Sequence, residues 1–364
     1  MCRNFLFYLI PILLLGFASC ERDDDEPPAR EYNGISRLYV TTSDYDSGAA
    51  SQIDNIWVVD SADTENASSY ITNWRSPAKG GRNIHFSPLN GGMVFQSSVN
   101  AAGVNDTAIH VFTVSDQGNV STSGKLANRR FDNVRGLAYT VVNSGINASS
   151  DFLLAVNKGI SDDFGNLFVF LNPRSSGAFK QPTFRVSLNF IPWGIFINEK
   201  DVYMVKTGSE GGIVAYTNMT QNFVEKRDTV LSIEPSYTLA VDGSQNLRGV
   251  SYSPSKDILV LTDYSSTGGT IPVGRILIFE NFSSHVSSKS IEPTRVITGE
   301  TTNLRQPMDV AIDPRAGGQY IYVADSQRKG VYRFNIDDNG NVAPNAEISL
   351  RGATPEGLSW DARD

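Results

Sequence analysis

Cysteine is almost absent from this sequence of 364 residues, in which only Cys2 and Cys20 occur. The chain beyond Cys20 therefore has no disulfide bond and no thiol nucleophile. Histidine is nearly as scarce, because His85, His110 and His285 stand far apart with no HxH or HxxxH spacing. This spacing argues against a histidine-ligated metal and against a catalytic triad. A domain without crosslinks must be held together by burial, for which a hydrophobic content of 40% is sufficient.

Positive charge is also in deficit, since the formal net charge is -8. No basic stripe interleaved with aromatic residues occurs, so we do not expect nucleic acid as a partner. Amphipathic helical patterns of any length are missing too. Short runs of β-branched and aromatic residues, separated by loops rich in Gly, Ser and Asp, predict an all-β fold.

The longest apolar run, Phe5 to Phe17, is too short for a membrane-spanning helix and contains Pro11. With Arg3 before it and Ala18-Ser19 after it, this layout predicts a secretory signal peptide over residues 1–19, with an uncleaved anchor as the alternative. The segment resembles a bacterial lipoprotein signal, although Phe17 replaces the usual leucine. The resemblance implies a lipid on Cys20 and a membrane attachment through it.

Residues 20–33 contain the stretch "ERDDDEPPAR", which is too charged to fold and predicts a flexible tether before a single domain at 34–364. An acidic run directly after the cysteine resembles the surface-export signal of Bacteroides-type lipoproteins. This implies an exported protein on the cell surface, anchored to the outer membrane. A plain solvated spacer, with the lipid facing the periplasm, is the alternative.

An internal repeat decides the domain organisation. A turn followed by an apolar strand recurs every 48 to 60 residues, measured at the second position of the motif. The six copies are "GRNIHFSP" (81–88), "RGLAYTV" (135–141), "WGIFIN" (193–198), "RGVSYSP" (248–254), "MDVAIDP" (308–314) and "EGLSWD" (356–361). Second, third and fourth strands follow most copies, so the array predicts a β-propeller with six four-stranded blades.

The last copy explains why the sequence closes on an isolated strand. Three N-terminal strands, within 36–45, 55–61 and 68–74, match the second, third and fourth strands of a blade and lack a first. We therefore expect "EGLSWD" to pair with them and close the ring, which leaves no wide-open sheet edge.

The pattern in "QPMDVAIDPRAGGQYIYVADSQRKGVYRF" (306–334), an apolar strand with Asp followed by "YVADS", resembles the NHL-repeat and TolB-like six-bladed propellers. The resemblance extends over residues 36–364. It implies the architecture and leaves the function open, because such propellers include hydrolases and binding modules alike.

Calcium-dependent gluconolactonase-type propellers are the enzymatic relatives to consider. The resemblance implies metal ligands at the starts of innermost strands, namely a Glu in an "EG" turn, an Asn and an Asp. Glu356 matches the first, whereas the sister positions hold no carboxylate or amide; Asn83, Asn246 and Asp309 lie nearby. Hard cations need several converging oxygens. The sequence thus predicts no metal or other cofactor, and calcium belongs to the lactonase alternative alone.

The same sister positions predict a different site. Arg82, Arg135 and Arg248 with Glu356 would place a net positive charge at the central channel, and Trp193 would add a flat apolar surface. Guanidinium groups bind carboxylate and phosphate in a bidentate manner. We therefore expect an anionic small ligand, such as an acidic sugar, at the channel mouth. The alternative is structural: the arginines would pair with repeat aspartates, Asp263, Asp313, Asp325 and Asp361.

Three function classes follow. The first is a ligand- or protein-binding envelope lipoprotein, which uses the channel mouth or long loops such as 262–275 for an anion, a glycan or an envelope protein. The second is a lactonase-like hydrolase. The third is a scaffold module within an outer-membrane complex. No catalytic residue is identified by sequence, which favours the binding class.

Overall fold

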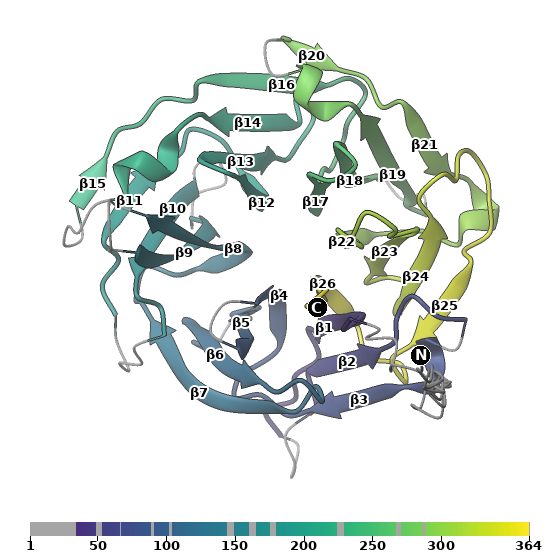
Figure 1. The fold of residues 1–364 in the computed structure, drawn as a ribbon, viewed down its shortest axis with the longest axis horizontal. Coiled ribbons are helices and arrows are strands. Elements are labelled where there is room, and N and C mark those ends of the chain that lie inside the picture. The colour runs from purple at the N-terminus through teal and green to yellow at the C-terminus, as the bar shows by residue number, and fades with distance from the viewer. Residues whose placement is uncertain are drawn as a thin grey trace, which may run out of the picture. The chain divides into compact units, whose positions relative to one another are not determined.

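Six β-sheets stand in a ring around a common centre, and each contributes one inner strand that carries the repeated motif (Figure 1). This is the predicted six-bladed propeller. In ring order the inner strands are β26 (Pro355–Asp361), β4 (Gly81–Ser87), β8 (Asn133–Asn143), β12 (Pro192–Asn198), β17 (Val250–Ser253) and β22 (Pro307–Ile312). We number the blades 1 to 6 in this order.

Each blade continues outward with three further strands. Blade 1 has β1 (Arg37–Thr42), β2 (Ile56–Asp60) and β3 (Ile71–Trp74), and blade 2 has β5 (Met93–Ser98), β6 (Ala108–Val114) and β7 (Val120–Ala127). Blade 3 has β9 (Ser149–Lys158), β10 (Gly165–Leu171) and β11 (Phe184–Ser187), and blade 4 has β13 (Asp201–Lys206), β14 (Gly212–Tyr216) and β16 (Tyr237–Val241). Blade 5 has β18 (Ile258–Ser265), β19 (Val273–Glu280) and β21 (Arg295–Thr298), and blade 6 has β23 (Tyr320–Asp325), β24 (Gly330–Asn335) and β25 (Ala346–Ser349).

The computed structural model describes residues 34–48, 53–65, 67–88, 91–101, 104–143, 149–159, 165–174, 180–223, 229–266, 271–285 and 288–363. The expected signal peptide, Cys20 and the tether at 20–33 lie outside these ranges. Residues 34–364 cluster as one compact unit. Within the described ranges, no helix is both long and apolar enough to cross a membrane.

Blade 1 closes the ring as the sequence predicts. Strand β26 pairs antiparallel with β1, with Leu358 opposite Val40 and Asp361 opposite Arg37. A backbone hydrogen bond from the Ile35 N–H to the Arg363 carbonyl, 2.7 Å long, extends this contact. The two ends of the domain therefore hold one sheet together.

Blades 3 and 4 differ from the expected four strands, because each gains a short fifth strand at its outer edge. The link between the third and fourth strands of the next blade supplies it: β15 (Thr229–Leu231) lies parallel to β11, and β20 (Ser290–Ile291) lies parallel to β16. A single bridge between Gly340 and Ile297 repeats the arrangement on blade 5. These links cover outer strands that would otherwise present open edges.

The apolar core is divided among the blade interfaces. Within the described residues, six hydrophobic clusters lie between neighbouring blades, and the cluster between blades 4 and 5 also includes Met308 of blade 6. Between blades 1 and 2, for example, Tyr39 stacks on Phe86 with ring centroids 5.5 Å apart. Both faces of every sheet are thus buried, which explains why strands such as "ILVL" in β18 are apolar without alternation.

The inner strands of adjacent blades are in backbone contact at the second motif position, a layer that we call the neck. It consists of Asn83, Gly136, Gly194, Gly249, Asp309 and Gly357. A Cβ atom on Gly249 would lie 2.5 Å from the Asp309 Cα, and one on Gly357 would lie 2.9 Å from the Asn83 Cα. The repeat requires glycine here because adjacent blades touch backbone to backbone.

We expect Gly249→Ala to lower the free energy of unfolding by about 1 to 3 kcal/mol, because the added methyl group overpacks the neck. Gly317→Ala is the matched control, since no atom lies within 4 Å of its added Cβ. Urea unfolding of both variants measures the difference. Equal stability of the two would contradict the close packing of the neck.

Deletion of residues 353–364 removes β26 and should abolish cooperative thermal unfolding. The deletion exposes the inner edge of β1 and opens the cluster that contains Leu358. Differential scanning calorimetry provides the measurement. A cooperative transition at the native melting temperature would show that ring closure does not stabilise the domain.

Candidate functional site at the channel mouth

The six inner strands all begin at the same end of the channel, which we call the mouth. At these starts lie Arg82 in β4, Arg135 in β8, Trp193 in β12, Met308 in β22 and Glu356 in β26. Arg248 lies just before β17. The five residues predicted from sequence thus occupy equivalent positions around one opening, and their contacts divide them into two groups.

The first group is an ion pair between blades 1 and 2. Arg82 Nη1 donates a hydrogen bond of 2.6 Å to Glu356 Oε2, and both side chains are largely buried. Burial raises the pKa of Glu356, and the neighbouring Arg82 opposes this shift. Arg82 therefore neutralises a carboxylate that has little access to water, which is a structural task.

The second group is a stack across blades 3, 4 and 5. The guanidinium carbon of Arg135 lies 3.9 Å from the Trp193 ring centroid, and that of Arg248 lies 3.5 Å from it. Arg248 also donates a 2.7 Å hydrogen bond from Nη2 to the hydroxyl of Tyr264. Trp193, itself buried, thus contacts two cations through cation–π interactions.

The mouth carries more positive than negative charge. Burial, together with repulsion from Arg248 and Arg82, lowers the pKa of Arg135 to about 9. Burial also lowers the pKa of Arg248. In the described part of the chain, no salt bridge joins either guanidinium to a carboxylate. One carboxylate, Glu356, therefore faces three arginines.

The structural alternative, in which repeat aspartates neutralise these arginines, is not what the structure shows. Asp263 pairs with Arg275, Asp313 with Arg315, and Asp361 with Arg363. Asp325 instead accepts backbone N–H groups from Arg305 and Gln306. Each aspartate binds partners within its own blade, where it fixes a loop.

Below the mouth, a side-chain clasp crosses the neck. Asn83 Nδ2 donates to Asp309 Oδ2 over 3.3 Å, and the same oxygen accepts the Leu358 N–H at 2.9 Å. Asp309 Oδ1 accepts the N–H of Val310 at 2.9 Å. The clasp joins blades 2, 1 and 6. From the sequence, Asn83 and Asp309 were candidates only as metal ligands, because the spacing of a repeat does not show which side chains meet across a channel.

The residues present do not fit the calcium site of the lactonase alternative. The Glu356 carboxylate binds Arg82, and each Asp309 oxygen already accepts one backbone N–H group. Asn246 turns away and donates to the Tyr264 carbonyl. Among the residues that the structure describes, no group of three or more His, Cys, Asp or Glu side chains converges as a metal site requires.

Comparison with known proteins supports the fold and nothing finer. No family model matches the sequence, and no curated protein matches it. A solved structure described as a "putative 6-phosphogluconolactonase" from Bacteroides fragilis is 12% identical, with a TM-score of 0.50 over 91% of this chain and 99% of that one. A "putative 6-phosphogluconolactonase" from Bacteroides uniformis is 10% identical, with a TM-score of 0.52 over 90% of this chain and 100% of that one.

Asp309 should make stability depend on pH. Burial, with repulsion from Glu356, raises its pKa from 3.8 to about 7. The folded protein therefore holds a proton that the unfolded chain releases near pH 4, so the contribution of Asp309 to stability is lost as pH rises toward 7.

Asp309→Asn removes this titration. Relative to the unaltered protein, the variant should gain up to about 4 kcal/mol in free energy of unfolding between pH 4 and pH 8. Urea unfolding at pH 4, 6 and 8 measures the difference between the two proteins. A difference that stays constant with pH would show that Asp309 has an ordinary pKa in the folded state.

Proposed function

We propose that this protein is a binding propeller that holds a small anion at the channel mouth through Arg135 and Arg248. The observation that carries the proposal is the uncompensated charge of the stack. Two partly buried arginines face the same indole, repel each other and have no carboxylate partner within the described residues. A bound anion would supply the missing negative charge at the place where burial makes its absence costly.

The chemistry of the ligand follows from the groups that would contact it. Guanidinium forks match the planar carboxylate and the tetrahedral phosphate. The name of the two solved propellers refers to a phosphorylated sugar lactone, which is an anion of this kind. At 10 to 12% identity this name supports the choice of test ligand, not an activity of this chain.

We propose further that the protein is exported and attached by a lipid on Cys20 to the outer membrane. The support is the sequence alone: the apolar run at 5–17, the small residues before Cys20 and the acidic stretch after it. Surface and periplasmic orientations both agree with this layout. Labelling intact cells with a membrane-impermeant reagent distinguishes them.

The lactonase-like alternative has weaker support in the geometry. Its metal ligands do not assemble, and the Glu356 carboxylate at the mouth is engaged by Arg82. The scaffold alternative stays a prediction, which co-purification with envelope proteins would test. The binding function is therefore the one that the arrangement of side chains supports best.

Two arginine substitutions separate binding from structure. Arg135→Ala should leave the melting temperature equal to or above that of the unaltered protein, because a partly buried charge that neighbouring arginines repel is removed. Arg82→Ala should lower the free energy of unfolding by about 3 kcal/mol, because it leaves Glu356 buried without its partner.

Ligand binding is read in the same thermal-shift assay with inorganic phosphate, gluconate and 6-phosphogluconate, against sodium chloride at equal ionic strength. An anion at a hundred times its dissociation constant adds about 2.7 kcal/mol and raises the melting point by several degrees. The shift should vanish in Arg135→Ala and Arg248→Ala and persist in Arg129→Ala, whose arginine is exposed. No shift with any of the three anions, or a shift that survives both substitutions, would refute the mouth as the binding site.

A further inference from the structure

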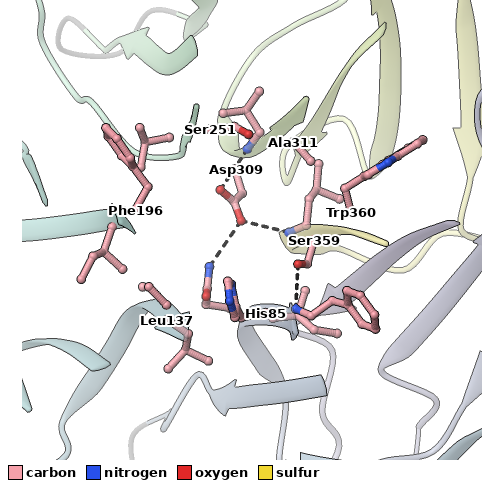
Figure 2. Close-up of a pocket in the computed structure, with 18 of the residues that line it drawn as sticks. His85, Leu137, Phe196, Ser251, Asp309, Ala311, Ser359 and Trp360 are labelled. Carbon is pink, nitrogen blue, oxygen red and sulfur yellow. Dashed lines mark hydrogen bonds between the residues drawn. The ribbon is translucent and has the colours of Figure 1, made fainter. Parts of the chain in front are cut away.

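Beyond the neck, the other half of the channel is a separate cavity of about 270 Å³ (Figure 2). Its wall is formed by the later residues of the six inner strands, and its floor by Asn83 and Asp309 of the neck. The mouth residues Arg82, Arg135 and Arg248 do not line it. A pocket of this size suits a compact ligand rather than a drug-sized one.

Three polar side chains in the wall occupy equivalent positions and act alike as acceptors. Ser359 Oγ accepts the Phe86 N–H at 2.8 Å, His85 Nε2 accepts the Tyr139 N–H at 3.2 Å, and Ser251 Oγ accepts the Ile312 N–H at 3.1 Å. In each case the side chain satisfies the open inner edge of the next blade.

Because these three side chains use an oxygen or nitrogen atom as acceptor, their own hydrogen atoms remain available as donors. Because burial lowers the pKa of His85 to about 4, its imidazole is neutral at pH 7 and carries its proton on Nδ1. The oxygen of each serine accepts a backbone N–H group, so the hydrogen of its hydroxyl group stays available as a donor. The wall therefore offers three donors, from His85, Ser251 and Ser359.

The remaining three blade junctions provide backbone donors. At the position of the serines and the histidine they carry Ala138, Phe196 and Ala311, whose side chains accept no hydrogen bond. One position further along, on the inner strand of the following blade, the backbone N–H points away from its own sheet. Phe86 and Ile312 show the same arrangement at the other junctions. At the three remaining junctions the N–H groups belong to Ile197, Tyr252 and Trp360, which line the cavity.

Charge distinguishes this cavity from the mouth. The described residues that line it include no lysine and no arginine, and its acidic group, Asp309, lies at the floor. A donor-rich wall calls for a ligand with many oxygen acceptors, and without a cationic side chain among the described lining residues an anion would lack a counter-charge. Asp309 Oδ1 accepts one N–H group and keeps a lone pair for a hydroxyl hydrogen. A neutral ring that carries several hydroxyl groups meets both conditions.

We propose that the cavity is a second binding site, which takes a neutral monosaccharide or cyclitol independently of the anion at the mouth. The ring oxygens accept from His85, Ser251, Ser359 and the free N–H groups of the wall, and one hydroxyl donates to Asp309. The inference does not rest on the function proposed for the mouth, because no residue that lines the cavity belongs to the stack.

Saturation-transfer difference NMR on the purified protein tests the proposal with D-glucose, D-galactose, D-mannose, D-xylose, N-acetyl-D-glucosamine and myo-inositol. At least one should give a saturable signal that 50 mM inorganic phosphate does not displace. Ser251→Ala should weaken its affinity about fivefold, the loss expected for one hydrogen bond.

Ser253→Ala is the matched control, because Ser253 lies on the same strand, binds Ser255 and does not line the cavity. Its affinity for the sugar should equal that of the unaltered protein. Ser359→Ala replaces Ser251→Ala if the latter fails to fold. The proposal is overturned if none of the six compounds gives a signal, if phosphate displaces the signal, or if the cavity and control variants bind equally well.

Discussion

The close approach of the six inner strands at the neck is the constraint on which the rest of the structure depends. Backbone meets backbone at Gly136, Gly194, Gly249 and Gly357, so a side chain fits at only two of the six places. Those two, Asn83 and Asp309, meet each other. Because each strand alternates its side chains, the positions on either side of this layer are fixed as well. The neck thereby sets both the ring of residues at the mouth and the wall of the cavity.

The architecture could be predicted from sequence because each blade repeats the same sequence motif. The spacing of the motif gave the number of blades, and the unmatched strand at 356–361 gave the closure. Alignment of the motif copies also placed Arg82, Arg135, Trp193, Arg248 and Glu356 at one opening. A repeat reports which residues are equivalent, and equivalent residues in a ring share a level along its axis.

The pairing of those residues could not be predicted in the same way. Nothing in the spacing shows that Arg82 binds Glu356 while Arg135 and Arg248 stack on Trp193. These partners come from different blades and depend on side-chain direction, which alignment does not contain. The fifth strands β15 and β20 escaped prediction for a related reason, since a two- or three-residue strand in a link has no periodic signal. The cavity donors Ser251, Ser359 and His85 could not be predicted either, because a serine or histidine within a strand carries no sequence signal of a binding site.

The two halves of the channel differ in the kind of interaction they offer. At the mouth, strength would come from charge held in a poorly solvated place, and it would weaken with salt. In the cavity, selectivity would come from the number and direction of neutral donors, which salt affects little. Asp309 is the group common to both halves, since Glu356 at the mouth adds repulsion and the cavity meets its carboxyl at the floor.

The strand directions in blade 1 show at which end of the ring the domain begins. The chain enters β1 beside Asp361, where β26 ends, while Glu356 lies at the opposite end of the same strand pair. The first residues that the structure describes, Gly34 and Ile35, therefore lie at the cavity end of the ring, and the three arginines of the mouth lie at the opposite end.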